Sequence, residues 1–592
     1  MVLGKHINRY YLRFSWRLLI GIATLFAVDY LQLVIPNLYQ MLINGVNDGF
    51  VETGGERVPF TADFLLDKIC LPMVAVILSI VVGRFLWRVM FFGTGIAVEK
   101  DLRDRMFDNA RFLSREYYQV HKVGDLMSLF TNDLDTVQEC FAWGFMMFFD
   151  ALLLGGLSIG KMFRMNAGLT LLSLIPMGLL LCCATVLGKY MMKKWDVRQA
   201  AFSKLSDFAQ ESFSGVAVIK AFVKESRELM AFGKLNRENE KANVAHTRAS
   251  VLMRVFVTLF VESVICIILG YGGYLVYKKV FNAGLLMEFI GYFSATVWPI
   301  MAVSELIDMT SRGKASLNRI GKLLDAETAV KDRDGAAPIE QAKGEIEFRN
   351  LTFTYPDGEL PALTDVSFKI EAGQSVGVVG RTGCGKTTLA QLILRCYNVP
   401  DGTLFVDGKD VNGVTIKSLR DNCAYVPQDN FLFSDTIENN IAFGVEEFTR
   451  EDVEKAAALS DVDKNISEFT KTYDTVLGER GVTVSGGQKQ RISIARALMK
   501  DAPILILDDA VSAVDTDTEK RILENLEKTR EGRTTVLIAH RISTVRRLDR
   551  ILYLDDGRVA GFGDYDTLYA ENDGFRRMVD LQKLEEGGEM NA

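Results

Sequence analysis

Residues Gly380 to Thr387 read GRTGCGKT; they follow the apolar run Ser375 to Val379 and precede the apolar, helix-favouring run Leu389 to Cys396. A glycine-rich loop between a strand and a helix is the setting in which this pattern binds phosphate. Its glycines let backbone N–H groups approach phosphate oxygens without an intervening Cβ, and the helix N-terminus adds a positive dipole. The stretch therefore predicts a phosphate-binding loop in an α/β domain. A purely structural glycine loop is the alternative.

The residue types in and after this loop predict individual roles. Lys386 would reach the β- and γ-phosphates, and the hydroxyl of Thr387 would hold Mg²⁺. Downstream, the apolar run 504–507 ends in Asp508, which is the expected second Mg²⁺ contact; an aspartate that caps a turn is the alternative. The residues expected to bind nucleotide from this loop are Gly380, Arg381, Thr382, Gly383, Cys384, Gly385, Lys386, Thr387 and Thr388.

The sequence around the loop alternates between short β-rich runs and helix-favouring segments. This alternation predicts an α/β layer architecture with parallel strands over residues 345–592. Residues 322–344, which carry charges and an Ala-Ala-Pro sequence, are the expected linker. The runs expected as strands are 345–348, 375–379, 504–507, 535–538 and 551–554.

The first half of the chain has a different pattern, with six apolar stretches that are each near the ~20 residues needed to span a bilayer. Long charged gaps at 98–140 and 189–250 separate the second stretch from the third and the fourth from the fifth. Their many Lys and Arg residues place these gaps, and both termini, in the cytoplasm. Residues 1–321 are therefore predicted to form an all-α six-helix transmembrane domain; buried soluble helices are the alternative. The stretches are 18–46, 68–97, 141–163, 167–188, 255–277 and 287–307.

Before the first stretch, basic residues alternate with aromatic ones between Lys5 and Arg17, which predicts an interfacial segment; a disordered tail is the alternative. Ionisable residues also occur within the apolar stretches, where they are costly and need a partner or a function. They favour an amphipathic cation as the substrate, with lipid or peptide as alternatives. The acids are Asp29, Asp150, Glu262, Glu305 and Asp308, and the bases are Arg84, Arg88 and Arg254.

The overall composition excludes several classes of protein. Of the 592 residues, 49% are hydrophobic, which excludes intrinsic disorder. The formal charge of −7 gives no general electrostatic reason to bind nucleic acid. The eight Cys form no CxxC pair and the four His are scattered along the chain, so neither a disulfide framework nor a metal cluster is expected.

Residues 351–563 resemble the nucleotide-binding domain of an ATP-binding cassette (ABC) transporter, because the motifs of that family occur in its order. The resemblance implies ATP and Mg²⁺ as cofactors. It implies that Tyr355 stacks on adenine, that Gln428 contacts Mg²⁺, and that His540 is the switch histidine. The sequence VSGGQ resembles the family signature, so Ser485, Gly486, Gly487 and Gln488 would contact the ATP held by a partner chain; Asp515 lies in the segment that resembles the D-loop.

The resemblance also covers the first half, less specifically. Residues 123–137 and 211–225 resemble the two intracellular loops of the exporter type, and residues 315–320 resemble the junction after the sixth helix. Residues 478–481, GERG, resemble an exporter-specific loop that contacts the partner. The chain is thus expected to be a half-transporter that dimerises in a bacterial plasma membrane, in contact with lipids. No peptidase domain is expected before the first helix, which argues against the peptidase-containing peptide exporters.

One position departs from the family pattern. Asp509 stands where the family usually has Glu, the residue that positions or deprotonates the attacking water. Aspartate is one methylene shorter, and a misplacement of about 1 Å can cost about 10²-fold in rate. Asp509, His540 and Gln428 are the expected catalytic residues, and the site built on this chain's own loop is expected to be slow. Together with the nearly standard VSGGQ signature, the slow site resembles one subunit of the family's heterodimers, which have one degenerate and one competent site. A slow homodimer, or an ATP-gated channel or regulator with little turnover, is the alternative.

Overall fold

A computed structural model describes residues 4–53, 56–478, 481 and 484–589, and the chain divides into two compact units. The helical unit comprises residues 1–110 and 124–325. The α/β unit comprises residues 326–592 together with the short segment 111–123, which the chain contributes between two long helices of the helical unit.

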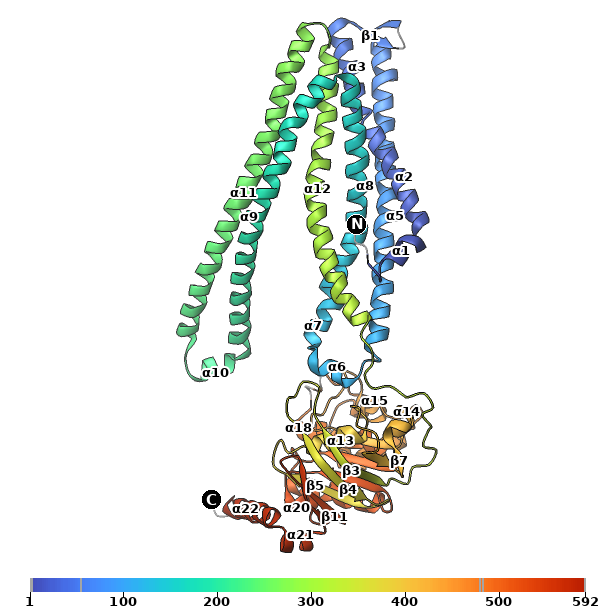
Figure 1. The fold of residues 1–592 in the computed structure, drawn as a ribbon, viewed down its shortest axis with the longest axis vertical. Coiled ribbons are helices and arrows are strands. Elements are labelled where there is room, and N and C mark those ends of the chain that lie inside the picture. Colours follow the sequence, from blue (N-terminus) through green and yellow to red (C-terminus); the bar gives the residue numbers. More distant parts are fainter. Residues whose placement is uncertain (1–3, 54–55, 479–480, 482–483, 590–592) are drawn as a thin grey trace. The chain divides into compact units, whose positions relative to one another are not determined.

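The helical unit consists of long helices joined by short connections (Figure 1). Pro36 lies in the first turn of α3, where the backbone N–H that proline lacks would have no partner within the helix. The preceding helix, α2, ends at Gln32. The elements are α1 (Asn8–Arg13), α2 (Ser15–Gln32), α3 (Ile35–Asp48), the hairpin β1 (Phe50–Thr53) and β2 (Glu56–Pro59), α4 (Ala62–Phe64), a π-helical turn (Leu65–Cys70), α5 (Leu71–Ala110), α7 (Val123–Ser128), a second π-helical turn (Leu129–Asp133), α8 (Leu134–Met165), α9 (Ala167–Ser214), α10 (Val216–Ala221), α11 (Glu225–Tyr277) and α12 (Ala283–Leu324).

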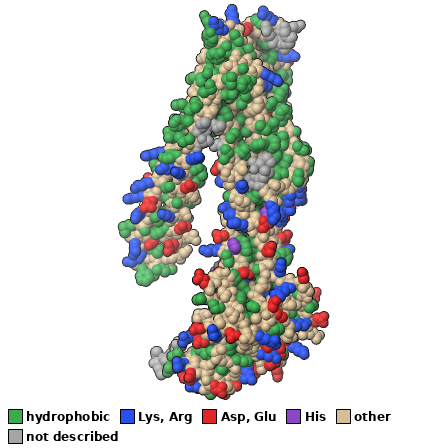
Figure 2. Space-filling view, viewed as in Figure 1, with side chains coloured by type: hydrophobic (Ala, Val, Ile, Leu, Met, Phe, Trp, Pro, Cys, Tyr) green, Lys and Arg blue, Asp and Glu red, His purple; other side chains and the backbone are tan. Residues whose placement is uncertain are grey.

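Five stretches of the described chain are long and apolar enough to cross a membrane: Ser15–Asp48, Ala62–Ala110, Val123–Met165, Glu225–Tyr277 and Ala283–Leu324. The remaining stretch expected from the sequence, 167–188, lies in α9, where the apolar helix Ala167–Leu180 is shorter. Hydrophobic side chains dominate the surface of the apolar part of this unit, whereas charged ones gather where α9 and α11 extend beyond it (Figure 2). The chain is a multi-pass membrane protein, as this pattern predicts.

Helices α9, α10 and α11 form an arm that separates from the other long helices along most of its length (Figure 1). The arm joins them at an apolar cluster that includes Leu169 of α9, Ile268 of α11 and Phe293 of α12. At the other end of the arm, large apolar side chains are exposed: Phe213, Val218, Phe222, Val223, Leu229 and Met230. Because exposed apolar surface is unfavourable in water, this tip is suited to contact another protein surface.

The α/β unit contains a six-stranded sheet in the order β12-β11-β5-β10-β9-β8 and a four-stranded antiparallel sheet in the order β4-β3-β6-β7. In the larger sheet all strands except β12 are parallel. The strands are β3 (Ile346–Phe353), β4 (Leu363–Ile370), β5 (Ser375–Gly380), β6 (Leu404–Val406), β7 (Lys409–Asp410), β8 (Cys423–Val426), β9 (Ile504–Asp508), β10 (Thr534–Ile538), β11 (Arg550–Asp555) and β12 (Arg558–Gly563).

The helices of this unit flank the sheets. They are α6 (Arg115–Val120), α13 (Lys386–Ile393), α14 (Ile416–Asp421), α15 (Ile437–Ala442), α16 (Arg450–Leu459), α17 (Asp463–Ser467), α18 (Gly486–Met499), α19 (Thr516–Thr529), α20 (Ile542–Val545), α21 (Tyr565–Glu571) and α22 (Asp573–Glu589). Two short 3-10 turns are Val411–Gly413 and Thr472–Asp474.

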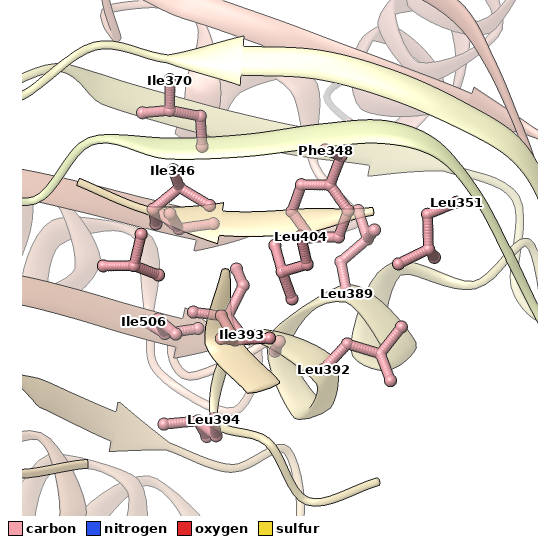
Figure 3. Packing of buried hydrophobic residues seen from close by; sticks show 14 of the residues in the cluster. Ile346, Phe348, Leu351, Ile370, Leu389, Leu392, Ile393, Leu394, Leu404 and Ile506 are labelled. Carbon is pink, nitrogen blue, oxygen red and sulfur yellow. The ribbon is translucent and has the colours of Figure 1, made fainter. Parts of the chain in front are cut away.

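Helix α13 belongs to the apolar core between the two sheets. Leu389, Leu392 and Ile393 of α13 pack with Phe348 of β3 and with Ile506 of β9 (Figure 3). The position of α13 is thus fixed from both sides, and so is the loop that precedes it. All five predicted strands are present, but the first, 345–348, belongs to the antiparallel sheet rather than to a parallel one.

Candidate nucleotide site

The candidate site lies at the carboxyl ends of four adjacent parallel strands. Strand β5 ends in Gly380, β9 in Asp508 and β10 in Ile538, and β8 ends just before the segment that contains Gln428. The register pairs Asp508 with Ile538, so the strand ends lie level. Ligands of open α/β sheets bind at this edge. The sheet order therefore brings together residues that are up to 158 positions apart in the sequence, from Gly380 to Ile538.

The phosphate loop has the backbone that its glycines allow. Gly380, Gly383 and Gly385 have φ angles of 153°, 84° and 97°, which side chains rarely adopt. A Cβ on Gly380 would lie 2.2 Å from the carbonyl oxygen of Leu554, so no larger residue fits there. Arg381 and Thr382 are exposed and Cys384 is buried.

Lys386 is buried beneath the loop. Its Nζ donates to the carbonyl oxygens of Gly380 at 2.8 Å and Arg381 at 3.0 Å, so the loop wraps around the ammonium group. A buried ammonium needs acceptors, and phosphate oxygens are stronger acceptors than these carbonyls. The position of Lys386 thus fits an anion on the loop.

The side-chain oxygens of Thr387 and Asp508, the two Mg²⁺ ligands expected from the sequence, lie next to each other. The Thr387 hydroxyl donates to Asp508 Oδ1 at 3.1 Å, and the Tyr425 hydroxyl donates to Oδ2 at 3.3 Å. Burial raises the pKa of Asp508, and these two hydrogen bonds act in the opposite direction. Hydroxyl and carboxylate oxygens are the ligands that Mg²⁺ prefers, so the pair fits that ion. No group of three His, Cys, Asp or Glu that could hold a metal occurs within the described residues.

Asp509 occupies a turn in the left-handed region, with φ of 52°. Its N–H donates to the carbonyl oxygen of Ile538 at 2.9 Å, and its own carbonyl accepts from the Ser512 hydroxyl at 3.0 Å and from Gln490 Nε2 at 3.3 Å. Aspartate adopts this conformation more readily than most residues. The backbone at Asp509 is therefore held from three sides.

Gln490 is a residue of this region that the sequence analysis missed. It is buried in α18, donates to the carbonyl oxygen of Asp509 and to Ser512 Oγ, and accepts from the Ala513 N–H at 2.9 Å. It thereby joins the helix that follows the VSGGQ segment to the turn that carries Asp509. Its position two residues after that segment was the only available signal.

Replacement of Gln490 by leucine should destabilise this junction. The variant removes the acceptor of the Ala513 N–H, and the loss of such a hydrogen bond costs about 0.5–1.5 kcal/mol. We expect a lower midpoint of thermal unfolding and a lower rate of ATP hydrolysis. Gln341→Leu is the control, because Gln341 is exposed and its side chain makes no hydrogen bond among the described residues. Unchanged stability of Gln490→Leu would show that the junction does not depend on these hydrogen bonds.

The VSGGQ segment forms the start of α18. Ser485 and Gln488 cap each other: Ser485 Oγ accepts from the Gln488 N–H at 3.3 Å, and Gln488 Oε1 accepts from the Ser485 N–H at 2.9 Å. The dipole of α18 makes this end attractive to an anion. Among the hydrogen bonds that the described residues make, none joins Ser485, Gly486 or Gly487 to the phosphate loop of the same chain. Within one chain, the phosphate loop and the start of α18 are therefore not joined by hydrogen bonds among the described residues.

The remaining expected residues lie as follows. Tyr355 packs edge-on against Phe353 and Tyr397, and its hydroxyl is 2.9 Å from that of Thr388 in α13, so the ring is half-buried. Gln428 is exposed after β8. Asp515 caps α19, where its carboxylate accepts from the Thr518 N–H at 3.0 Å. Of the GERG segment, Glu479 and Arg480 lie outside the described residues.

His540 follows β10 and is exposed. The side chain of Gln582, in the C-terminal helix α22, holds this segment: its Nε2 donates to the His540 carbonyl at 2.7 Å and its Oε1 accepts from the Ile542 N–H at 2.8 Å. Both halves of one side-chain amide thus fix the backbone beside His540. This contact spans about 40 residues, and no local sequence pattern indicates it.

The segment 111–123 packs within the α/β unit. Gln119 of α6 donates to Asp357 at 2.5 Å and accepts from the Tyr397 hydroxyl at 2.8 Å, and the Thr328 hydroxyl donates to the Phe112 carbonyl at 2.9 Å. The segment that resembles the first intracellular loop, 123–137, begins where this segment ends. Residues 111–123 are therefore part of the α/β unit, although the chain contributes them between two long helices.

Comparisons with known proteins agree with this geometry. Two family profiles match the chain: the ABC transporter transmembrane region over residues 18–300 and the ABC transporter over residues 363–512. The chain is 35% identical over 590 residues to a probable multidrug resistance ABC transporter ATP-binding/permease protein, YheI, of Bacillus subtilis, covering 99% of this chain and 98% of the relative. It is 35% identical over 581 residues to the multidrug resistance-like ATP-binding protein MdlA of Escherichia coli. That match covers 97% of this chain and 96% of the relative.

A solved structure also matches over nearly the whole chain. It is that of a bacterial Atm1-family ABC exporter with ATP bound. It has a TM-score of 0.78 and 26% identity, and the match covers 98% of this chain and 99% of that one.

Proposed function

The chain belongs to the ABC transporter family, an ATPase coupled to transport, and from this premise we propose that it is one half of a heterodimeric exporter of amphipathic, drug-like compounds. The observation that carries the proposal is the division of the site: the phosphate loop with Lys386, Thr387 and Asp508 is assembled within the chain, whereas the start of α18 is not joined to it. A second chain would supply the missing half. We assign residues 1–321 to the transmembrane domain, 322–344 to the linker and 345–592 to the nucleotide-binding domain.

In the proposed assembly this chain contributes to two ATP sites. At its own site Lys386 binds the β- and γ-phosphates of ATP, Tyr355 faces the adenine, and Thr387, Asp508 and Gln428 would hold Mg²⁺. When bound, that ion neutralises charge on the phosphates. At the partner's site, Ser485 and the N–H groups of Gly486 and Gly487 donate to the γ-phosphate. Because neither chain alone completes a site, ATP binding favours the closed dimer. Loss of the γ-phosphate contacts after hydrolysis lets the dimer open again.

Asp509 supports the heterodimer. A site with the shorter carboxylate hydrolyses ATP slowly, yet the VSGGQ segment is intact and can complete an active site for a partner that carries Glu. The exposed apolar tip of the α9–α11 arm, with Phe213 and Phe222, also suits a second subunit. A homodimer in which Asp509 acts at both sites is the alternative. Both termini are proposed to lie in the cytoplasm of a bacterial cell.

Native mass spectrometry of the tagged chain extracted from its own host tests the assembly. We expect a complex of this 66.2 kDa chain with a second chain of different mass, whose sequence has Glu at the position of Asp509. A complex of twice 66.2 kDa would contradict the heterodimer.

A second candidate function is favoured by Asp509 alone: an ATP-gated channel or regulator with little turnover. ATP-dependent accumulation of an amphipathic compound against its gradient, in inside-out vesicles, separates the two. Flux only down the gradient would support the channel. Lipid or peptide export would appear in the same assay as transport of those compounds in place of drug-like ones.

A further inference from the structure

Two carboxyl groups meet inside the helical unit. Asp29 of α2 is 1% exposed, and its Oδ2 is shielded from solvent without a hydrogen-bond donor. The carboxyl group of Asp150, on α8, is close enough to that of Asp29 for the two charges to interact. On the other side of Asp150, the indole Nε1 of Trp298 in α12 donates to Oδ2 at 2.7 Å. Three helices thus contribute to one polar site, called here the acid-pair site (Asp29, Asp150 and Trp298).

The charges around the acid-pair site do not balance. Two carboxylates this close oppose each other's ionisation unless positive charge is nearby. The basic group whose charge acts on both acids is Arg84 of α5, which donates to Gln32 Oε1 at 3.2 Å and forms no ion pair with either acid among the described residues. Lys161 of α8 is directed to the carbonyl of Leu33 and the hydroxyl of Tyr292. One negative charge therefore remains, and one proton or one monovalent cation would neutralise it.

Trp298 gives the acid-pair site an apolar, aromatic side. Its side chain is 41% exposed although its N–H is bound, so part of the ring is free to contact a ligand. An indole ring attracts cations more strongly than other aromatic side chains. The next residue, Pro299, lies close to Gly155 of α8, where an added Cβ would be 3.1 Å away. This close packing of α12 on α8 holds the ring beside Asp150.

We propose that the acid-pair site binds the positive group of an organic monocation, with Asp29 and Asp150 neutralising its charge and Trp298 contacting its aromatic part. The proposal rests on the exporter function and names the substrate class and site for it. It differs from the sequence-based expectation, in which Glu262 and Glu305 are the acids whose replacement would test cation export. Glu262 of α11 and Glu305 of α12 are exposed, and their side chains make no hydrogen bond to other described residues, so they lack such an environment.

Equilibrium binding of tetraphenylphosphonium to the purified, assembled transporter without ATP tests the site. Asp29→Asn and Asp150→Asn each remove one charge at nearly constant volume, and we expect a loss of affinity of about tenfold or more. Trp298→Leu should weaken binding several-fold, by removing the ring. Glu262→Gln, which removes an acid of the same unit outside the site, should leave the affinity unchanged. Tetraphenylborate has the same shape and the opposite charge, and its binding should not weaken in the aspartate variants.

The outcomes are distinct. Unchanged tetraphenylphosphonium affinity in both aspartate variants would overturn the proposal and leave a proton as the occupant of the pair. An equal loss of tetraphenylborate binding would overturn it too, because it would mean that the variants damage an apolar pocket. If Asp29→Asn does not assemble, as judged by size-exclusion chromatography, Asp150→Asn carries the test from the less buried side. ATP-driven transport is measured separately: binding without transport would contradict the exporter function but not the site.

Discussion

Exchange of Asp509 for glutamate is expected to raise ATP hydrolysis at the site built on this chain's own phosphate loop by up to about 10²-fold, because about 1 Å of displacement can account for such a factor. The structure around Asp509 should keep its backbone in place when the side chain is lengthened. The backbone of Asp509 is held by the Ile538 carbonyl, Ser512 and Gln490, so the added methylene extends the carboxylate instead of shifting the turn. The left-handed φ of 52° is less favourable for glutamate, by up to about 1–2 kcal/mol, and this sets the stability cost of the variant.

The measurement is the rate of ATP hydrolysis by the assembled complex in a Ser485→Ala background. In the proposed dimer Ser485 completes the partner's ATP site. Ser485→Ala therefore lowers hydrolysis at the partner's site, so that the rate at the site containing residue 509 can be measured. Asp509→Asn, which keeps the size and removes the charge, should not raise the rate. If Asp509→Glu folds and its rate does not rise, the missing methylene is not the cause of slow hydrolysis.

Replacement of Gly487 by alanine is expected to lower total ATP hydrolysis by about 10²-fold, the loss that about 1 Å of misplacement can cause. An added Cβ at this position would lie 2.9 Å from the carbonyl oxygen of Ala513, a backbone atom in the turn that follows Asp509. Real Cβ atoms essentially never come this close, so the start of α18 has to move. The N–H groups of Gly486 and Gly487 would then miss the phosphate of the partner's ATP.

The effect should be confined to the partner's site. Binding of a fluorescent ATP analogue to this chain's own phosphate loop should persist, because Lys386 and Thr387 are on a different helix. Gly413→Ala is the matched control: its Cβ would meet no atom within 4 Å, so the same exchange should leave hydrolysis intact. Unaltered hydrolysis by Gly487→Ala would mean that the start of α18 does not complete the active site.

Much of this protein could be predicted from local sequence. The phosphate loop, the strands that end in Gly380 and Asp508, and five of the six apolar stretches were found within the described residues, because each is specified by neighbours in the chain: a φ angle that side chains rarely adopt, a buried strand, or about 20 apolar residues in a row. The class of the protein followed, since the order of the motifs is itself a sequence property.

The features that were not predicted from the sequence all depend on contacts with distant parts of the chain. The run 345–348 looks like any buried strand, and its place in an antiparallel sheet depends on pairing with β4 and β6. Gln490 and Gln582 are polar residues in ordinary helical patterns, and only the approach of a distant turn makes them important. Likewise, Gln119 gains its role from Tyr397, at a separation of 278 residues.

The sequence by itself determined that this chain has a membrane-spanning half and an ATP-binding half, because hydrophobic length and a glycine-dependent loop are properties of contiguous residues. The tertiary structure decided which polar groups meet: Thr387 with Asp508, Gln490 with the turn at Asp509, and Asp29 with Asp150 beside Trp298. These contacts join elements about 20 to 150 residues apart. Packing in three dimensions places them, and no periodicity along the chain records which helix faces which.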